Sequence, residues 1–286
     1  MANHYPYNSG VSAATIEITP PNSFPERWLR AYGSLDHPNM LGGLCGLGIL
    51  IAVYLFINLY QNNYSRAKEI GLSLMIILAT VGLFLSFSRA AIIAMALGLI
   101  IIIASRPRAW RRALLSILFI AATGLILFFN YGQLYHNRLE PLQGVASQSI
   151  DDRATYFQES MTIIKKHPLF GVGAGNYGLA LVQQFPDKPN SYYYQPVHNV
   201  FLFIWSEIGV LGLALWLILL FKLLLDGLKT IKISAESGLA VAGLSLVIAL
   251  MFFDHWLWSL HFGLMFFWLI VGLVLKIFLA NKKPSA

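Results

Sequence analysis

Charged residues are scarce in this sequence of 286 residues: only 12% are Asp, Glu, Lys or Arg, whereas 57% are hydrophobic. A soluble domain of this length carries about a quarter charged residues. The deficit excludes an ordinary soluble protein and indicates a chain that lies mostly in lipid. The net charge of +7 comes from short basic clusters between apolar runs, so we expect no nucleic acid partner.

Cysteine is almost absent, and so are the patterns that bind metals. The single cysteine, Cys45, cannot form an intramolecular disulfide, so cysteine usage says nothing about the redox compartment. The seven histidines are scattered, without a pair at metal-binding spacing on a helix, so we expect no metal and no cofactor. The first forty residues lack a basic start followed by an apolar core, so we expect no signal peptide.

Long apolar runs are what the sequence has instead. A helix needs about 20 mostly apolar residues to cross a bilayer. We predict seven membrane-spanning helices, at about 41–60, 70–87, 90–105, 113–129, 199–224, 238–253 and 261–280. The second and third would overshoot the ~30 Å hydrocarbon core as one helix, so we expect a tight hairpin with Arg89 at its turn. The predicted fold class is an all-α integral membrane protein.

Basic residues predict the orientation of these helices. The loop at 105–112 (SRPRAWRR) has four arginines and no acid, which is typical of the cytoplasmic side. The other segments that then fall inside also contain basic residues: Arg66 and Lys68, Lys229 and Lys232, and Lys282 and Lys283 in the tail. The predicted organisation is an outer segment at 1–40, four helices in 41–129, an outer loop at 130–197, three helices in 198–280 and a cytoplasmic tail at 281–286. The turn at Asp254 and His255 also falls outside.

The outer loop is predicted to contain an amphipathic helix over 147–168. Ser149 or Asp151 would cap its start, and Pro168 would end it. The stretch GAGNYG, at 173–178, matches a dinucleotide-binding spacing, but it follows a helix and not a strand. A tight, closely packed loop is the better interpretation.

Polar residues at the predicted outer boundary are the candidates for chemistry. Arg89 either extends from its turn to water or binds a substrate, and Arg153 either pairs with a neighbouring aspartate or binds a substrate anion. His198, beside Asn199, is a group that titrates near neutral pH where the outer loop re-enters the membrane. Glu207, nine residues later, faces away from His198 on a helix, and we expect a structural role for it.

Two further histidines flank a predicted outer turn. His255 and His261 stand close to Trp256 and Trp258. Aromatic side chains concentrate at the boundary between membrane and water. We therefore interpret both histidines as interfacial side chains in preference to site residues.

Four segments together resemble a known family. They are SLDHPNMLGG (34–43), SFSRAA (86–91), DDRATYFQESMTIIKKHPLFGVGAGNY (151–177) and HNVFLFIWSEIGVLG (198–212). Each motif alone is weak, but their order and the place of the long outer loop resemble the O-antigen ligase and polysaccharide polymerase family. The resemblance extends from about residue 28 to the C-terminus. Family members usually carry several more helices before the HPN motif. Either such helices lie upstream of this sequence, or its outer N-terminal segment is translocated without a preceding helix.

The resemblance implies a GT-C-like membrane fold and a metal-independent glycosyltransferase. Such an enzyme transfers a glycan from a polyprenyl-diphosphate carrier to an acceptor at the outer, periplasmic face of the cytoplasmic membrane. The acceptor is a glycolipid of the lipopolysaccharide core, a growing glycan or a protein. By resemblance, His198 is the catalytic base, Arg89 and Arg153 bind the donor diphosphate, and Asn199 supports His198.

Other functions stay open at this stage. A polysaccharide polymerase or a protein O-glycan transferase would use the same residues. A transporter would place its ionisable groups near the middle of the membrane, whereas here only Glu207 lies inside a predicted span. A non-catalytic fragment that acts with partners is a further alternative.

Overall fold

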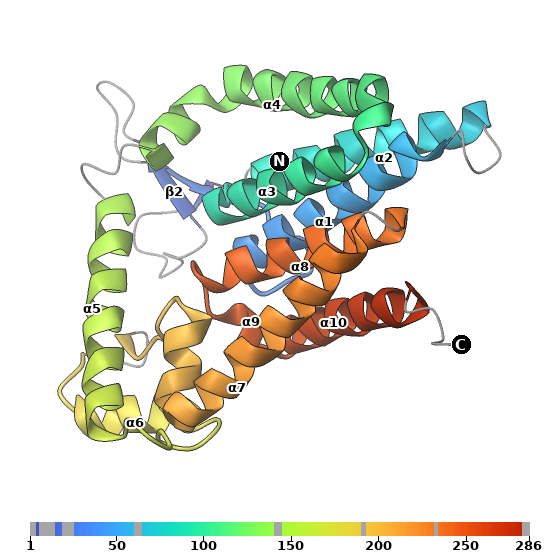
Figure 1. Cartoon of the computed structure of the whole chain (residues 1–286). Coiled ribbons are helices and arrows are strands. Elements are labelled where there is room, and N and C mark those ends of the chain that lie inside the picture. Colours follow the sequence, from blue (N-terminus) through green and yellow to red (C-terminus); the bar gives the residue numbers. More distant parts are fainter. Residues whose placement is uncertain are drawn as a thin grey trace, which may run out of the picture. The chain divides into compact units, whose positions relative to one another are not determined.

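Helices make up almost all of the structure (Figure 1). The structure, a computed structural model, describes residues 4–5, 15–18, 26–59, 65–139, 145–189, 193–231 and 234–281. Lys232, Lys282 and Lys283, which contributed to the predicted orientation, lie outside the described residues. The chain forms two compact units, Met1–Ser149 (unit 1) and Ile150–Ala286 (unit 2).

Among the described residues, five helices are long and apolar enough to cross a membrane. They are α1 (Pro38–Ile57), α2 (Arg66–Leu85), α4 (Trp110–Leu139), α7 (Val200–Thr230) and α10 (His261–Asn281). Two further apolar helices, α3 (Arg89–Ser105) and α8 (Ala235–Met251), have 17 residues each. The predicted class of a helical, multi-pass membrane protein is confirmed. The count of seven spans stays a prediction.

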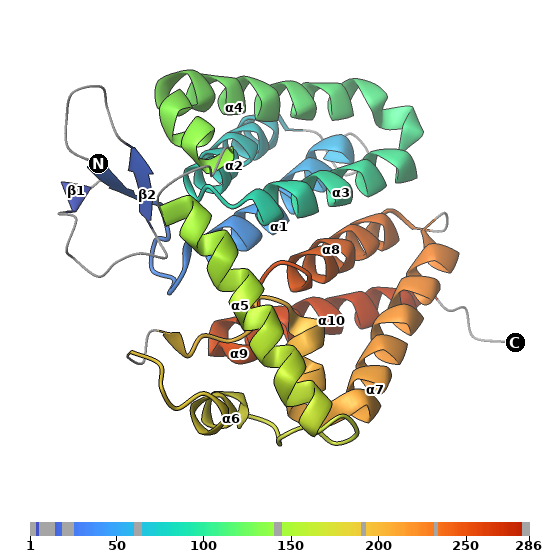
Figure 2. The same ribbon diagram turned by 90° about the vertical axis from the view of Figure 1, so that its left-hand side faces the viewer.

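In unit 1, α1 packs against α2 and α3, and α2 packs against α4 (Figures 1 and 2). The helix α1 is 61% buried over its most apolar window, whereas α4 is only 22% buried. Large apolar side chains such as Ile126 and Phe129 are exposed on α4. In a membrane protein such a helix turns its apolar side chains to lipid. A short 3₁₀ helix, η2 (Pro107–Ala109), connects α3 to α4.

The described residues of the N-terminal segment of unit 1 form strands. They are β1 (His4–Tyr5), β2 (Thr15–Ile18) and β3 (Glu26–Leu29), which pair antiparallel in the order β1-β3-β2. Ile16 of β2 is buried in a cluster with Phe87, Leu134 and Tyr135. The all-α prediction missed this small sheet because paired strands this short give almost no periodic signal.

In unit 2, α10 packs against α8, α7 and the one-turn helix α9 (Trp256–Ser259). Trp256 and Phe267 lie in the core of these helices, and both are almost fully buried. The helix α5 (Val145–Lys166) crosses the direction of α10 instead of running along it, and α6 (Tyr177–Gln184) follows it (Figures 1 and 2).

The predicted start of the amphipathic helix is wrong. The helix α5 begins at Val145, so Ser149 and Asp151 lie inside it and cannot cap its first turn. Capping residues also occur within helices, and here Val145 to Gln148 contain no Gly or Pro that would delay the helix. Arg153 consequently lies in the third turn of α5, away from the positive end of the helix dipole.

A glycine interrupts the long helix α7. Gly209 has φ 71° and ψ −178°, which is not a helical conformation. In a continuous helix the N–H of Val210 would bond to the C=O of Ser206. Instead, Val210 N donates to Pro168 O at 2.9 Å, and Ser206 O accepts from Val172 N at 2.9 Å. The main chain of the glycine-rich loop therefore replaces the broken helical bonds.

The glycines of this loop and of α7 allow that close approach. Gly173 N donates to Glu207 O at 2.8 Å. A Cβ on Gly171, whose φ is +67°, would lie 2.4 Å from Glu207 O, and a Cβ on Gly209 would lie 2.0 Å from Leu169 O. The tight loop predicted for GAGNYG is present up to Asn176, whereas Tyr177 and Gly178 already belong to α6 and no atom lies within 4 Å of a Cβ on Gly175 or Gly178.

Candidate functional site

The predicted hairpin turn at Arg89 is confirmed in unit 1, because α2 ends at Leu85 and α3 begins at Arg89. Ser88 caps α3: its hydroxyl accepts from Ala91 N at 3.4 Å. Phe87 takes a left-handed conformation, with φ 49°, and its ring is buried. The Arg89 side chain is exposed at the start of α3. The SFSRA motif thus builds a turn that presents an accessible guanidinium group.

A second arginine, Arg30, supports this turn and was not predicted from the sequence. It is only 2% exposed, its Nε donates to Ser86 O at 2.8 Å, and its Nη2 donates to Asn39 Oδ1 at 2.8 Å. His37 caps α1, since its Nδ1 accepts from Asn39 N at 3.1 Å. Arg30 therefore ties the HPN segment to the turn before Arg89. A buried cation held by defined acceptors orients its neighbours.

In unit 2, His198 lies directly before α7, between aromatic rings. Its ring stacks on Tyr156 of α5, with centroids 5.8 Å apart and planes 12° apart. It meets His255 edge to face, with centroids 5.0 Å apart. Tyr156 is buried, and His198 is partly exposed. The histidine is therefore held in a fixed orientation with one side open to solvent.

Two residues from the turn between α8 and α9 join His198. The donor atoms of His198, Asp254 and His255 all lie within 4.8 Å of one another. Asp254 is buried, and its Oδ1 accepts from His255 N at 2.8 Å. The His255 Nδ1 is 2.6 Å from Ser259 Oγ. This grouping can share a proton among its members, and its atoms are of the kind that can hold a cation.

Arg153 lies near the same grouping. Burial lowers the pKa of His255, the Asp254 carboxylate raises it, and the guanidinium of Arg153 lowers it. Arg153 is partly buried on α5, one helical turn before Tyr156. The predicted base and one predicted diphosphate ligand thus belong to one cluster in unit 2, the histidine cluster (Arg153, Tyr156, His198, Asp254 and His255).

The Asn199 side chain forms hydrogen bonds with the main chain of two helices. Its Oδ1 caps α7 by accepting from Leu202 N at 3.0 Å, and its Nδ2 donates to Phe252 O at 3.3 Å. It therefore ties the start of α7 to the end of α8. These bonds fix the backbone that carries His198, and through it the position of the ring.

Glu207 has the structural role that the sequence predicted. Its carboxylate accepts from Gly175 N at 3.0 Å, Tyr177 N at 3.4 Å and Trp258 Nε1 at 2.9 Å. It is only 4% exposed. The carboxylate fastens the glycine-rich loop and the start of α6 to α7 and α9. Three N–H donors compensate the burial of its charge.

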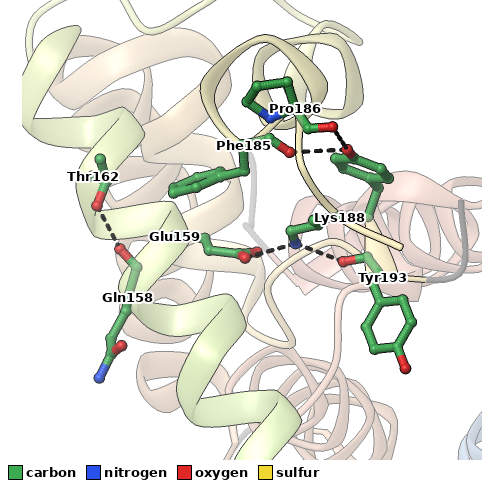
Figure 3. A network of polar contacts seen from close by, with 8 residues as sticks. Gln158, Glu159, Thr162, Phe185, Pro186, Lys188 and Tyr193 are labelled. Atoms are coloured by element: carbon green, nitrogen blue, oxygen red, sulfur yellow. Dashed lines mark hydrogen bonds and ion pairs between the residues drawn. The ribbon is translucent and has the colours of Figure 1, made fainter. Parts of the chain in front are cut away.

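The chain that leads to His198 is held against α5 by a partly buried lysine, Lys188 (Figure 3). Lys188 Nζ lies 2.6 Å from Glu159 Oε1 and donates to Tyr193 O at 2.6 Å. It also lies 5.1 Å from the ring centre of Tyr194 and 6.0 Å from that of Tyr156. These contacts fix the segment around Lys188 and Tyr193 beside Tyr156, the ring on which His198 stacks.

The sequence missed Asp254 and His255: Asp254 was only placed in an outer turn, and His255 was interpreted as an interfacial side chain. His261 is exposed at the start of α10, whereas His255 belongs to the histidine cluster. One signal was present: the orientation predicted for the helices put the 254–255 turn on the same side as His198. Which side chains meet across 56 intervening positions depends on helix packing, which apolar periodicity does not encode.

The helices and the cluster define a multi-pass membrane protein with a histidine and arginine site in its second unit. A model of the O-antigen ligase family matches residues 74–217, about half of the chain, so the chain belongs to this family. The match contains Arg89, Arg153 and His198. A comparison with curated proteins finds no match. Membership places the chain among membrane enzymes related to glycosyl transfer, which in general use lipid-linked glycans and glycan acceptors.

Proposed function

We propose that the protein transfers a glycan from a polyprenyl-diphosphate carrier to an acceptor hydroxyl at the outer face of the cytoplasmic membrane. The observation that carries the proposal is the meeting of His198, Asp254, His255 and Arg153 in one cluster. A base and a cation close together are what this displacement needs. An outer site also fits a donor that is carried in the lipid, because sugar nucleotides are scarce outside the cell.

His198 acts as the general base. The acceptor hydroxyl loses its proton to the imidazole as its oxygen attacks the anomeric carbon, and the bond from that carbon to the diphosphate breaks. Histidine suits this task because its ordinary pKa lies close to neutrality. Asp254 and His255 help to hold the proton once it has moved. A direct displacement of this kind inverts the anomeric configuration.

Arg153 and Arg89 bind the leaving diphosphate. The diphosphate gains negative charge as its bond to the sugar breaks. A guanidinium group donates two parallel hydrogen bonds to phosphate oxygens and stays protonated throughout. The partly buried Arg153 is supplied by α5, and the exposed Arg89 by the turn before α3. In this proposal the two arginines take the place of a metal ion, and no cofactor is used.

Three single substitutions test this proposal. We expect His198→Ala, Arg153→Ala and Arg89→Ala each to lower glycan transfer by about 10²–10³, as removal of a transition-state stabiliser does. Transfer is measured in cells that lack the native protein, with the amount of each variant in the membrane determined in parallel. Normal transfer by all three variants at normal expression would disprove the assignment.

Matched substitutions control for loss of charge alone. His261→Ala removes an exposed histidine at the start of α10, and Arg108→Ala removes an exposed arginine of η2. Both variants should keep normal transfer. The products then identify the acceptor: long chains on a lipid anchor indicate a ligase, long chains on the carrier a polymerase, and glycans on protein an O-glycan transferase.

A further inference from the structure

The turn that follows α5 exposes two large apolar side chains beside two lysines. Phe170 is 74% exposed and Leu169 is 56% exposed. Lys165 and Lys166, which end α5, are exposed as well. A pair of large apolar side chains in water is unfavourable and marks a surface that contacts something apolar. We call Lys165–Phe170 the interfacial turn.

Hydrogen bonds to the carbonyl oxygen of Pro168 fix this turn to α7. Val210 N donates to Pro168 O at 2.9 Å, and Trp205 Nε1 donates to the same oxygen at 3.1 Å. Leu169 O lies so close to Gly209 that only a glycine fits there. The turn cannot move away from residues 205–210 of α7 without breaking these bonds. Its height relative to a membrane is therefore set by α7.

The apolar stretch of α7 places those residues near one boundary of the membrane. The first lysine in α7 is Lys222, and counting back about 20 residues, the length of a membrane span, leads to about Leu202. Residues 205–210 thus lie within two turns of the outer end of that stretch. Leu215, 70% exposed, continues an apolar face of α7 from that point inward. The interfacial turn is therefore fixed close to the N-terminal end of the apolar stretch of α7.

We propose that the interfacial turn docks on the outer leaflet of the bilayer. Phe170 and Leu169 enter the boundary between headgroups and acyl chains, and Lys165 and Lys166 bind lipid phosphates. Apolar side chains flanked by lysines bind anionic membrane surfaces in this manner. Lys166 also lines a cavity of about 370 Å³ together with Leu179 of α6, which gives a headgroup space beside the turn.

This docking goes beyond the proposed reaction and sets where that reaction takes place. Lys166 and Arg153 lie on the same helix, 13 residues apart, which is about 20 Å. With the end of α5 held in the leaflet, Arg153 and Tyr156 stay at a constant height above the lipid. A diphosphate that projects from its lipid carrier is presented at such a height.

Spin labelling tests the docking directly, since Cys45 is the single cysteine. In a Cys45→Ala background, Phe170→Cys is labelled with a nitroxide in vesicles of phosphatidylcholine and phosphatidylglycerol. Two matched positions calibrate the measurement: Gln158→Cys, exposed on α5, for water, and Leu215→Cys, exposed on α7, for lipid. Collision of the label with oxygen and with a water-soluble nickel complex is compared at all three.

The expected result is a ratio of oxygen to nickel collisions at Phe170 that shifts from the Gln158 value toward the Leu215 value. Leu169→Cys gives the same test if Phe170→Cys fails to fold. The joint substitution Lys165→Gln and Lys166→Gln should shift the ratio back toward water with phosphatidylglycerol present, and not in pure phosphatidylcholine. A ratio equal to that of Gln158 overturns the proposal. So does a label shielded from both reagents, which indicates a protein partner or a second copy.

Discussion

At the scale of single residues, the surroundings of His255 should make the stability of the protein depend on pH. Its pKa is lowered mainly by burial; Asp254 acts in the opposite direction, and Arg153 lowers the pKa further. In the unfolded chain a histidine titrates near pH 6.5. Below that pH the unfolded chain therefore binds more protons than the folded protein does. His255 should therefore lower the free energy of unfolding as the pH falls below about 6.5.

We expect His255→Gln to reduce this pH dependence. The thermal midpoint of the unmodified protein in detergent should fall between pH 7.5 and pH 5.5 by more than that of the variant. His261→Gln, which changes an exposed histidine of α10, serves as the control and should keep the full decrease. Equal decreases in all three proteins would mean that the partly buried His255 contributes nothing to the pH dependence.

At the scale of elements, the contact between the glycine-rich loop and α7 shows which parts of the fold the sequence can predict. Apolar periodicity located the start of each long apolar helix to within a few residues, although α4 and α7 extend ten and six residues past their predicted ends. Glycine spacing predicted a tight loop. The break in α7 was not predicted. A glycine within an apolar run, such as Gly209, does not reveal a positive φ. That φ is imposed by the bond between Val210 N and Pro168 O, a contact across 42 positions.

We expect Gly209→Ala to destabilise the protein strongly. Its φ of 71° disfavours a side chain, and the added Cβ would lie 2.0 Å from Leu169 O, which belongs to the main chain and cannot turn aside. Strain and clash together should lower the free energy of unfolding by roughly 2–4 kcal/mol. Thermal unfolding in detergent measures the loss.

Gly178→Ala is the matched control for this substitution. Gly178 lies in α6, and no atom lies within 4 Å of the position that its Cβ would take. Alanine favours a helix over glycine by about 1 kcal/mol, so this variant should be as stable as the unmodified protein or slightly more so. An unchanged thermal midpoint for Gly209→Ala would show that α7 can straighten and release the loop.

At the scale of the whole molecule, composition and charge indicated the class of protein, and four weak motifs in order indicated the family. The site could be predicted only in part. Of the residues proposed to act in the reaction, Arg89, Arg153 and His198 lie within the segment that matches the family, whereas Asp254 and His255 lie beyond it. Motif spacing along a chain contains no distances in space. Kinetic measurements can test whether Arg89 of unit 1 and Arg153 of unit 2 act on the same diphosphate.

A double-mutant cycle on the rate of glycan transfer measures that common action. Arg89→Ala and Arg153→Ala should each cost about 10²–10³, and independent effects would multiply to about 10⁴–10⁶. If both guanidinium groups bind one diphosphate, loss of the first already misplaces it, so the double variant should lose little more than the worse single variant. Initial rates are taken in proteoliposomes with a lipid-linked donor.

A second double variant, Arg153→Ala with Arg108→Ala, controls for unspecific coupling. Arg108 is an exposed arginine of η2, so this double variant should lose no more transfer than Arg153→Ala alone. A fully multiplicative loss for Arg89 and Arg153 would show that they act at separate sites, and Arg89 would then have no part in binding the diphosphate.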